Sequence, residues 1–385
     1  MRRRTFLTGA AAGLGLAGCG RAPALTGPDG VTLTFKGSYS PLKSRALLTL
    51  AGVKGITVRH AVDCWSVVYP GRDGQGRPVR LSGLLALPRG VAARGLVSWQ
   101  HGTTTTRSDV PSNLSTEGLA AAIVFGANGY AAVAADYLGL GVSPLVHTYY
   151  AADDTAAAVI GLLDVVKEIP GVPGAPPFLI GFSQGGHASL ATQRALEAAG
   201  RPVLGCAPVA AAPNLRTISL PAAMTGQAVQ ASLYLSYLAR GLAARYAQPL
   251  DSALTPEMAA LARRLYDQPH KPDEIIAALP KDPRRLFVPE FLAALDGQGT
   301  HWLVDAAAAN EVSHFKPKAS VRLYYGSADI DVTPKESVTT ARMFASAGAD
   351  ARAIDLGPVD HNASALKAGP LALAWLEALA EPAKG

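Results

Sequence analysis

The chain has 385 residues, of which 49% are hydrophobic and 17% are charged. A composition this apolar excludes a disordered protein, and the length allows one large domain or two of moderate size. The formal net charge is +6, which on its own would be compatible with binding to nucleic acid or to an anionic membrane. Aromatic residues make up only 6% of the chain, too few to favour stacking on single-stranded bases.

Residues 1–19 have the pattern of a secretory signal peptide and carry half of the net charge. Three arginines at positions 2–4 precede an uncharged stretch that is too short to span a bilayer. Residues 3–7 (RRTFL) resemble a twin-arginine export signal. Removal of this segment leaves a net charge of +3, too small an excess to predict a nucleic-acid partner.

The signal ends in a motif for lipid modification. Residues 16–19 (LAGC) resemble a bacterial lipobox, in which Cys19 would carry the lipid and become the new N-terminus. We therefore expect an exported cell-envelope lipoprotein, anchored by lipid on the periplasmic or extracytoplasmic face of a membrane. The alternative is an ordinary signal peptide with an incidental cysteine. Residues 20–30 are rich in Gly and Pro and predict a tether.

The next segments predict strands. Partly alternating Val, Thr, Tyr and Leu residues indicate an antiparallel opening, over 31–36, 55–69 and 78–87. Short apolar runs follow at Gly95–Gln100, Gly129–Ala135, Phe178–Phe182, Val203–Ala211, Val321–Tyr325 and Ala351–Leu356. Most of them alternate with helix-like stretches, for example 152–168, 185–199, 335–347 and 364–381. This alternation predicts an α/β protein with a mostly parallel sheet covered by helices on both faces.

One long block interrupts the alternation. Residues 213–317 are helical in texture, contain many prolines and offer no convincing strand, which predicts a helical cap inserted into a core formed by 31–212 and 318–385. Within the cap, Thr217–Ala239 carries no charge. Its proline, glycine and glutamine residues argue against a membrane span. The run is expected either to pack on the sheet or to line an apolar substrate cavity.

A candidate nucleophile lies between a predicted strand and a predicted helix. Gly181-Phe182-Ser183-Gln184-Gly185 fits G-x-S-x-G, with an apolar strand before it and a helix-compatible segment after it. In a nucleophile elbow this arrangement exposes the serine hydroxyl above the sheet. The alternative is a glycine-rich turn with an incidental serine.

A serine nucleophile needs a base, and the base needs an orienting acid. His361 is the histidine that follows a late strand and precedes a final helix, so we expect it to be the base. For the acid, Asp329 and Asp331 compete just after the Val321–Tyr325 strand. We favour Asp329, because its spacing from the strand end suits a short turn that presents a carboxylate to a histidine.

An oxyanion hole needs two N–H donors. One is expected from Gln184, the residue after the nucleophile. The other is expected from Thr103 or His101, in the loop after the Gly95–Gln100 strand. The alternative for this loop is a threonine-rich surface turn. The His101 side chain is expected to be a structural brace, since it precedes the nucleophile in the chain.

We expect neither a metal nor a cofactor. There is no H-E-x-x-H and no cysteine cluster, and no phosphate-binding or dinucleotide fingerprint follows a strand. Two cysteines remain after the signal, Cys64 and Cys206, which could pair in an oxidising compartment. Cys206 lies in an apolar run, which favours a free buried thiol.

Three motifs together resemble one family. They are Trp99-Gln100-His101-Gly102-Thr103, Asp136-Tyr137-Leu138-Gly139-Leu140-Gly141 and Gly181-Phe182-Ser183-Gln184-Gly185-Gly186-His187-Ala188. They resemble the α/β-hydrolase superfamily and, within it, the secretory-lipase family of the lipase-A type, over roughly residues 60–380. The resemblance implies hydrolysis of carboxylic esters, with Ser183 as nucleophile, Asp329 as acid and His361 as base. The second motif is expected to shape the pocket or to be a plain turn.

The expected function is a serine lipase or esterase that acts through an acyl-enzyme on a small-molecule or lipid ester. One alternative is a peptidase or amidase on the same fold. The other is a surface lipoprotein that binds a ligand in a catalytically silent pocket.

Overall fold

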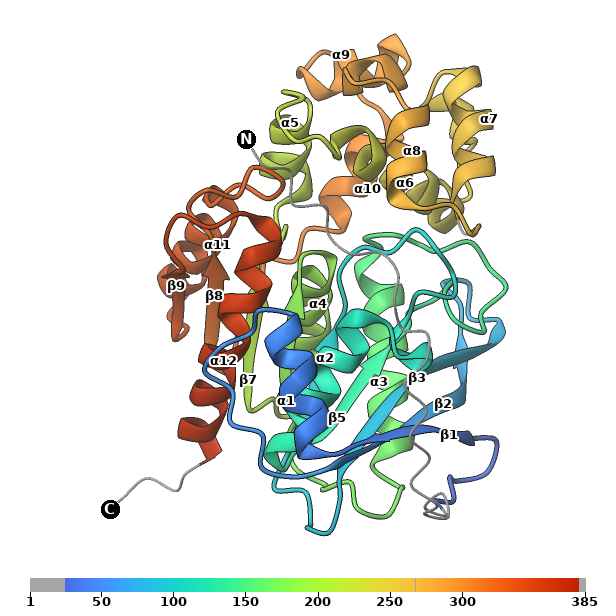
Figure 1. Ribbon diagram of the computed structural model, residues 1–385. Coiled ribbons are helices and arrows are strands. Elements are labelled where there is room, and N and C mark those ends of the chain that lie inside the picture. The colour runs from blue at the N-terminus through green and yellow to red at the C-terminus, as the bar shows by residue number, and fades with distance from the viewer. Residues whose placement is uncertain (1–24, 267, 381–385) are drawn as a thin grey trace.

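The computed structural model describes residues 25–266 and 268–380, and one nine-stranded sheet lies at its centre. In sheet order the strands are β1 (Thr32–Tyr39), β2 (Val62–Arg72), β3 (Pro78–Pro88), β5 (Ala131–Ala135), β4 (Leu96–Gln100), β6 (Phe178–Phe182), β7 (Gly205–Val209), β8 (Val321–Tyr325) and β9 (Ala351–Asp355) (Figure 1). In this order, the neighbouring pairs from β1 to β5 are antiparallel, and those from β5 to β9 are parallel.

The parallel half confirms the strands that were expected from the apolar runs. Every residue of β4, β5, β6 and β7 is buried. Continuous apolar runs rather than alternating ones are typical of parallel strands that are covered on both faces. The carboxyl ends of these strands meet at one edge of the sheet, where ligands bind in open α/β sheets.

The antiparallel opening is also confirmed, but one boundary was wrong. The strand expected at 55–69 begins only at Val62. The N–H groups of Arg59 and His60 both donate to the carbonyl of Ala127, at 3.0 and 2.9 Å, so this stretch bonds to the 3-10 helical turn Gly126–Asn128 rather than to a neighbouring strand. A helix that was not predicted, α1 (Pro41–Leu50), precedes it.

Alternate side chains of the strands fill two separate cores, as the period of two in a strand requires. In β6, Leu179 packs with α3 (Ala152–Val166), α4 (Gln184–Ala198) and α11 (Lys335–Ser346) on one face. Its neighbours Phe178 and Ile180 pack on the other face with α1, α2 (Thr116–Val124) and α12 (His361–Ala380). The sheet is therefore covered on both faces.

Between β7 and β8, the described residues form helices and one isolated bridge, Leu254 to Phe287. They form most of a third hydrophobic core, which also includes Tyr149, Tyr150 and Ala151, and Figure 1 shows them gathered at one end of the molecule. Proline opens three of these helices at its preferred first position. The helices are α5 (Leu220–Ala223), α6 (Ala231–Tyr246), α7 (Pro256–Leu265), α8 (Pro272–Ala278), α9 (Pro289–Leu295) and α10 (Trp302–Ala309), after a π-helical turn at Leu215–Ser219.

The predicted signal peptide and its lipobox Cys19 lie outside the described residues, as does the first part of the predicted tether. Among the helices of the described chain, none combines the length and the hydropathy that a membrane span needs. The uncharged run Thr217–Ala239 begins in the π-helical turn, contains all of α5 and ends within α6.

Candidate active site

Ser183 lies at a sharp turn, directly after β6 and directly before α4. Its backbone angles are φ 56° and ψ −118°, a strained conformation for a residue with a side chain. The two glycines of the motif allow the turn. A Cβ on Gly181 would lie 2.2 Å from the carbonyl oxygen of Gly185, and one on Gly185 would lie 1.9 Å from that of Gln100. This is the geometry of a nucleophile elbow.

The structure brings the three predicted catalytic side chains together. His361 Nε2 lies 2.9 Å from Ser183 Oγ, and His361 Nδ1 lies 2.8 Å from Asp329 Oδ2. All three are buried, with Ser183 6%, His361 5% and Asp329 4% exposed. With the Nδ1 proton donated to the carboxylate, Nε2 presents its lone pair to the serine hydroxyl. The arrangement can therefore remove the Ser183 proton and hold the resulting imidazolium.

Of the two competing aspartates, Asp329 reaches the histidine. Its other oxygen, Oδ1, accepts hydrogen bonds from the backbone N–H groups of Asp331 and Val332, at 3.0 and 2.9 Å. These bonds fix the carboxylate in the turn after β8. The side chain of Asp331 does not bond to the histidine and lines the pocket beside Ser183.

The predicted oxyanion residues surround the elbow. Gln184 is the first residue of α4, so its N–H has no partner in a preceding helical turn and lies at the positive end of the helix dipole. The loop after β4 packs closely on the same turn. A Cβ on Gly185 would also lie 2.7 Å from the His101 carbonyl oxygen, so only a glycine leaves room for the loop. In that loop, the Thr103 hydroxyl is 2.6 Å from the Tyr149 hydroxyl.

His101 is a buried brace. Its ring nitrogens lie 2.8 and 3.3 Å from the carbonyl oxygens of Gly102 and Asp136, and its ring stacks on Tyr137 at 4.1 Å between centroids. Burial lowers the pKa of His101 to about 4, so the ring is neutral near pH 7. Both of its ring nitrogens face backbone carbonyls, and the nitrogen that bonds to Ser183 Oγ belongs to His361.

Glu117 was missed in the sequence and holds the oxyanion loop. The Gly102 N–H lies 3.0 Å from both oxygens of the Glu117 carboxylate, and the Trp99 indole N–H donates to it at 3.3 Å. Burial raises the pKa of Glu117 to about 7, against these two donors and the charge of His361, which lower it. Because the Gly102 N–H is engaged, the second oxyanion donor is left to Thr103 or His101. The acidic residue in the first turn of α2 was the only local signal.

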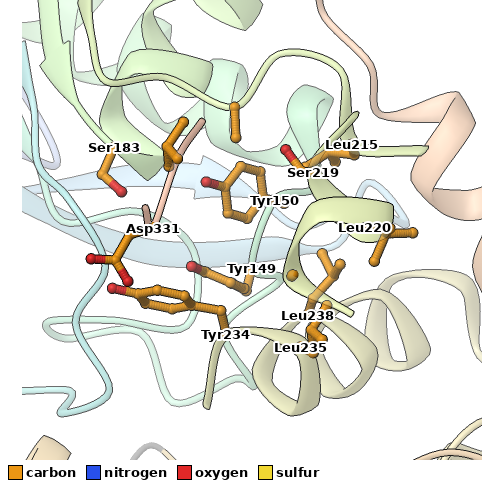
Figure 2. A pocket seen from close by; sticks show the side chains of 13 residues that line it. Tyr149, Tyr150, Ser183, Leu215, Ser219, Leu220, Tyr234, Leu235, Leu238 and Asp331 are labelled. Carbon is orange, nitrogen blue, oxygen red and sulfur yellow. The ribbon is translucent and has the colours of Figure 1, made fainter. Parts of the chain in front are cut away.

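A pocket opens beside Ser183 (Figure 2), and its empty space, including the part open to solvent, is about 520 Å³. Its walls are mainly apolar and aromatic, and they come from the elbow, from the Tyr149–Tyr150 corner, from the turn after β8 and from the helical segment. Leu235 and Leu238 of α6 line it while they also pack in the helical core, so the uncharged run lines the pocket and packs against other helices rather than on the sheet. The lining side chains are Tyr149, Tyr150, Ser183, Ala212, Leu215, Ser219, Leu220, Ala223, Tyr234, Leu235, Leu238, Asp331 and Val332.

The Asp136–Gly141 motif does not line this pocket, and it contacts residues that hold the elbow and the loop after β4. The Tyr137 hydroxyl donates to the His101 carbonyl at 3.0 Å. His147, held by the Leu138 carbonyl at 2.7 Å, accepts a bond from the Gln184 side chain at 2.9 Å. The motif therefore positions both candidate oxyanion segments.

The remaining candidates for other chemistry are structural. Within residues 25–266 and 268–380, no group of three His, Cys, Asp or Glu side chains is arranged to hold a metal ion. Cys64 and Cys206 are buried and free rather than paired. His187, one turn after the elbow, contacts the Asn310 carbonyl at 2.7 Å, and burial lowers its pKa to about 4.

Comparison with known proteins gives matches among solved structures alone, since no family model and no curated protein sequence matches the chain. A candidate hydrolase from Legionella pneumophila superposes with a TM-score of 0.85 at 24% identity, covering 94% of this chain and 99% of that one. The rice cell wall degrading esterase LipA from Xanthomonas oryzae, in a ligand-bound form, gives 0.77 at 22%, with 93% and 98% covered.

A third match is more distant. The closed state of lipase A from Candida antarctica has a TM-score of 0.59 at 12% identity, covering 87% of this chain and 77% of that one. Identities this low carry the fold and not the activity. Together with the mostly parallel sheet and the helices on both of its faces, they show that this chain has the α/β-hydrolase fold.

Proposed function

We propose that this chain is a serine hydrolase that cleaves carboxylic esters through an acyl-enzyme. The observation that carries the proposal is the unbroken relay from Ser183 through His361 to Asp329, with spacings of 2.9 and 2.8 Å, on a strained elbow. The resemblance to secretory lipases of the lipase-A type supports it, as do esterases and lipases among the structural neighbours.

In the first half of the reaction, Ser183 Oγ attacks the ester carbonyl while His361 Nε2 takes its proton. Asp329 keeps the Nδ1 proton in place and stabilises the cation that forms. The N–H of Gln184 and one N–H of the 101–103 loop bind the negative oxygen of the tetrahedral intermediate. His361 then gives its proton to the leaving alcohol, and the acyl group remains on Ser183.

In the second half, water replaces the alcohol. His361 removes a proton from the water as it attacks the acyl-enzyme, and the second tetrahedral intermediate uses the same donors. Its collapse returns the proton to Ser183 and releases the acid. The first and the last of these proton transfers run along the Ser183–His361 contact already present in the structure.

The test is a substrate series on the purified chain. Hydrolysis of p-nitrophenyl esters of graded acyl length is compared with hydrolysis of aminoacyl anilides, with Ser183→Ala as the control for background. Ester turnover that depends on Ser183 supports the proposal. Faster turnover of the anilides would favour a peptidase or amidase, and absence of turnover by the folded chain would favour a binding protein.

We also propose that the enzyme is exported by the twin-arginine route and anchored to a cell-envelope membrane by lipid on Cys19, with residues 213–317 as a cap over the site. The signal and lipobox motifs support the first part. Metabolic labelling with an alkyne fatty acid tests it. We expect label on the wild-type chain and none on Cys19→Ala, and equal labelling of the two would contradict the anchor.

A further inference from the structure

The Asp331 carboxylate lies in the wall of the pocket beside the nucleophile, and the proposed mechanism does not use it. Its backbone N–H is bonded to Asp329. In the described part of the chain, no hydrogen bond or ion pair reaches the Asp331 side-chain oxygens. Figure 2 shows this carboxylate on the same side of the pocket as Ser183, next to the ring of Tyr234.

The surroundings of this carboxylate make it unfavourable for the ionised group to stay without a hydrogen-bond partner. Burial raises the pKa of Asp331, as do the neighbouring charges of Asp329 and Asp360, while His361 lowers it. The nearby Tyr234 hydroxyl donates elsewhere, to the Gln230 side chain at 2.7 Å. A half-buried acceptor without a partner, in a pocket lined mainly by apolar and aromatic side chains, is typical of a group that meets its partner in the ligand.

The Tyr149 and Ser219 hydroxyls of the lining are already engaged within the protein, whereas the Tyr150 hydroxyl is uncharged and has no hydrogen bond among the described residues. The Tyr149 hydroxyl is paired with Thr103, and the Ser219 hydroxyl donates to Glu336. Asp331 is therefore the charged acceptor that the pocket offers to a bound group. It can accept a hydrogen bond from a hydroxyl or an ammonium, and it repels a carboxylate.

We propose that Asp331 determines specificity by selecting esters whose pocket-bound group carries a hydrogen-bond donor, a hydroxyl or an ammonium, over plain alkyl and anionic esters. This rests on the proposed ester hydrolysis and names the substrate class of the same site. A hydrogen bond to a charged acceptor in a partly dry pocket discriminates by about tenfold to a hundredfold.

The test uses two matched pairs of substrates, because either side of the ester can occupy the pocket. One pair is the p-nitrophenyl ester of butyrate and that of 3-hydroxybutyrate. The other is propyl butyrate and 3-hydroxypropyl butyrate. A 3-aminobutyrate ester and a monosuccinate ester report the effects of a positive and a negative charge.

We expect wild-type kcat/KM to favour the hydroxylated member of at least one pair by about tenfold or more. Asp331→Leu, which is similar in size and lacks an acceptor, abolishes that preference, and it relaxes the rejection of the monosuccinate ester. Asp331→Asn keeps one acceptor oxygen and retains part of the preference, and it covers the case in which the leucine variant does not fold.

Asp360→Asn is the matched control. It also removes a negative charge near His361, but its carboxylate is exposed and caps α12 by accepting from the Ala363 N–H at 2.8 Å. We expect this variant to keep the wild-type ratio in both pairs. Equal ratios in wild type, Asp331→Asn and Asp331→Leu for both pairs would overturn the role of Asp331 while leaving ester hydrolysis intact. No turnover of any ester by the folded wild type would contradict both proposals.

Discussion

The sheet and the helical segment contribute different kinds of side chain to one pocket. The sheet side provides groups fixed in direction. Ser183 and Asp329 sit in turns after β6 and β8, His361 is the first residue of α12, and the three side chains bond to one another. The helical segment provides bulk, chiefly leucines such as Leu235 and Leu238. The rate of catalysis depends on the orientation of the catalytic groups, whereas recognition of an alkyl group depends on the shape of the pocket. Substitutions on the sheet side should therefore change kcat, and substitutions in the helical segment should change substrate preference.

Removal of the nucleophile should have the largest effect. Ser183→Ala deletes one oxygen from the sheet side, and we expect kcat to fall by about 10⁴- to 10⁶-fold. The melting temperature should change little, because the deleted atom mainly contacts His361. Steady-state kinetics and thermal unfolding of the same preparation check both points. Full esterase activity in this variant would remove Ser183 from the mechanism.

Asp329→Asn should come next. The amide can donate to His361 Nδ1 and so favours the tautomer whose Nε2 carries the proton, and we expect kcat to fall by about 10⁴-fold. Asp331→Asn is the comparison variant in the same turn, and it should keep most of the activity on an unsubstituted butyrate ester. A larger loss in Asp331→Asn than in Asp329→Asn would reverse the assignment of the acid.

Glu117→Ala tests a residue that supports the oxyanion loop without touching the substrate. Loss of the acceptor for the Gly102 N–H should loosen that loop, so we expect kcat to fall by about tenfold to a hundredfold with little change in KM, less than loss of an oxyanion donor itself. Glu117→Gln retains one acceptor oxygen and should recover part of the loss. A change confined to KM would show that Glu117 acts on binding instead.

A change on the helical side should alter preference rather than rate. Ala223 of α5 lines the pocket and is only half-buried, so Ala223→Leu narrows the pocket without overpacking the core. We expect kcat/KM for decanoyl esters to fall by about tenfold, with acetyl esters unaffected. Ala222→Leu, its neighbour outside the lining, is the control. Equal losses on short and long esters would show that this wall does not select chain length.

The smallest effect concerns stability where the two regions meet. Glu336 of α11 is buried and binds Asn214 and Ser219 at the start of the helical segment, and burial raises its pKa to about 7. A carboxyl whose folded-state pKa is raised contributes stability below its unfolded pKa, near 4.5, and loses it as the pH rises through about 7. Wild type should therefore lose stability relative to Glu336→Gln between pH 5 and pH 8. Parallel thermal unfolding curves at all pH values would contradict this.

Most of the sheet and the three relay residues could be predicted from the sequence, because each signal is local. The elbow needs two glycines at fixed spacing between a strand and a helix, and Asp329 follows its strand by a short turn. The same locality explains the misses. The segment at 55–61 alternates like a strand, yet the N–H groups of Arg59 and His60 bond to Ala127, in a 3-10 helical turn distant in the sequence.

The positions of the supporting and lining residues depend on tertiary contacts, which no local sequence pattern predicts. Glu117 reaches Gly102 only because α2 packs beside the end of β4. Tyr150 enters the pocket through a corner with φ 63°, and nothing in the neighbouring residues signals that conformation. Asp331 could be recognised as a rival acid but not as part of the pocket wall, because the bonds that hold Asp329 decide which carboxylate turns to the histidine.

The central claim is that the relay activates Ser183, and reaction with a fluorophosphonate tests it most directly. Such a probe modifies an activated serine, and mass spectrometry of the digested protein locates the modified residue. We predict stoichiometric modification of wild type at Ser183, much slower modification of His361→Ala, and none at that position in Ser183→Ala. A folded wild-type chain that stays unmodified, or that is modified at another serine, would contradict the account.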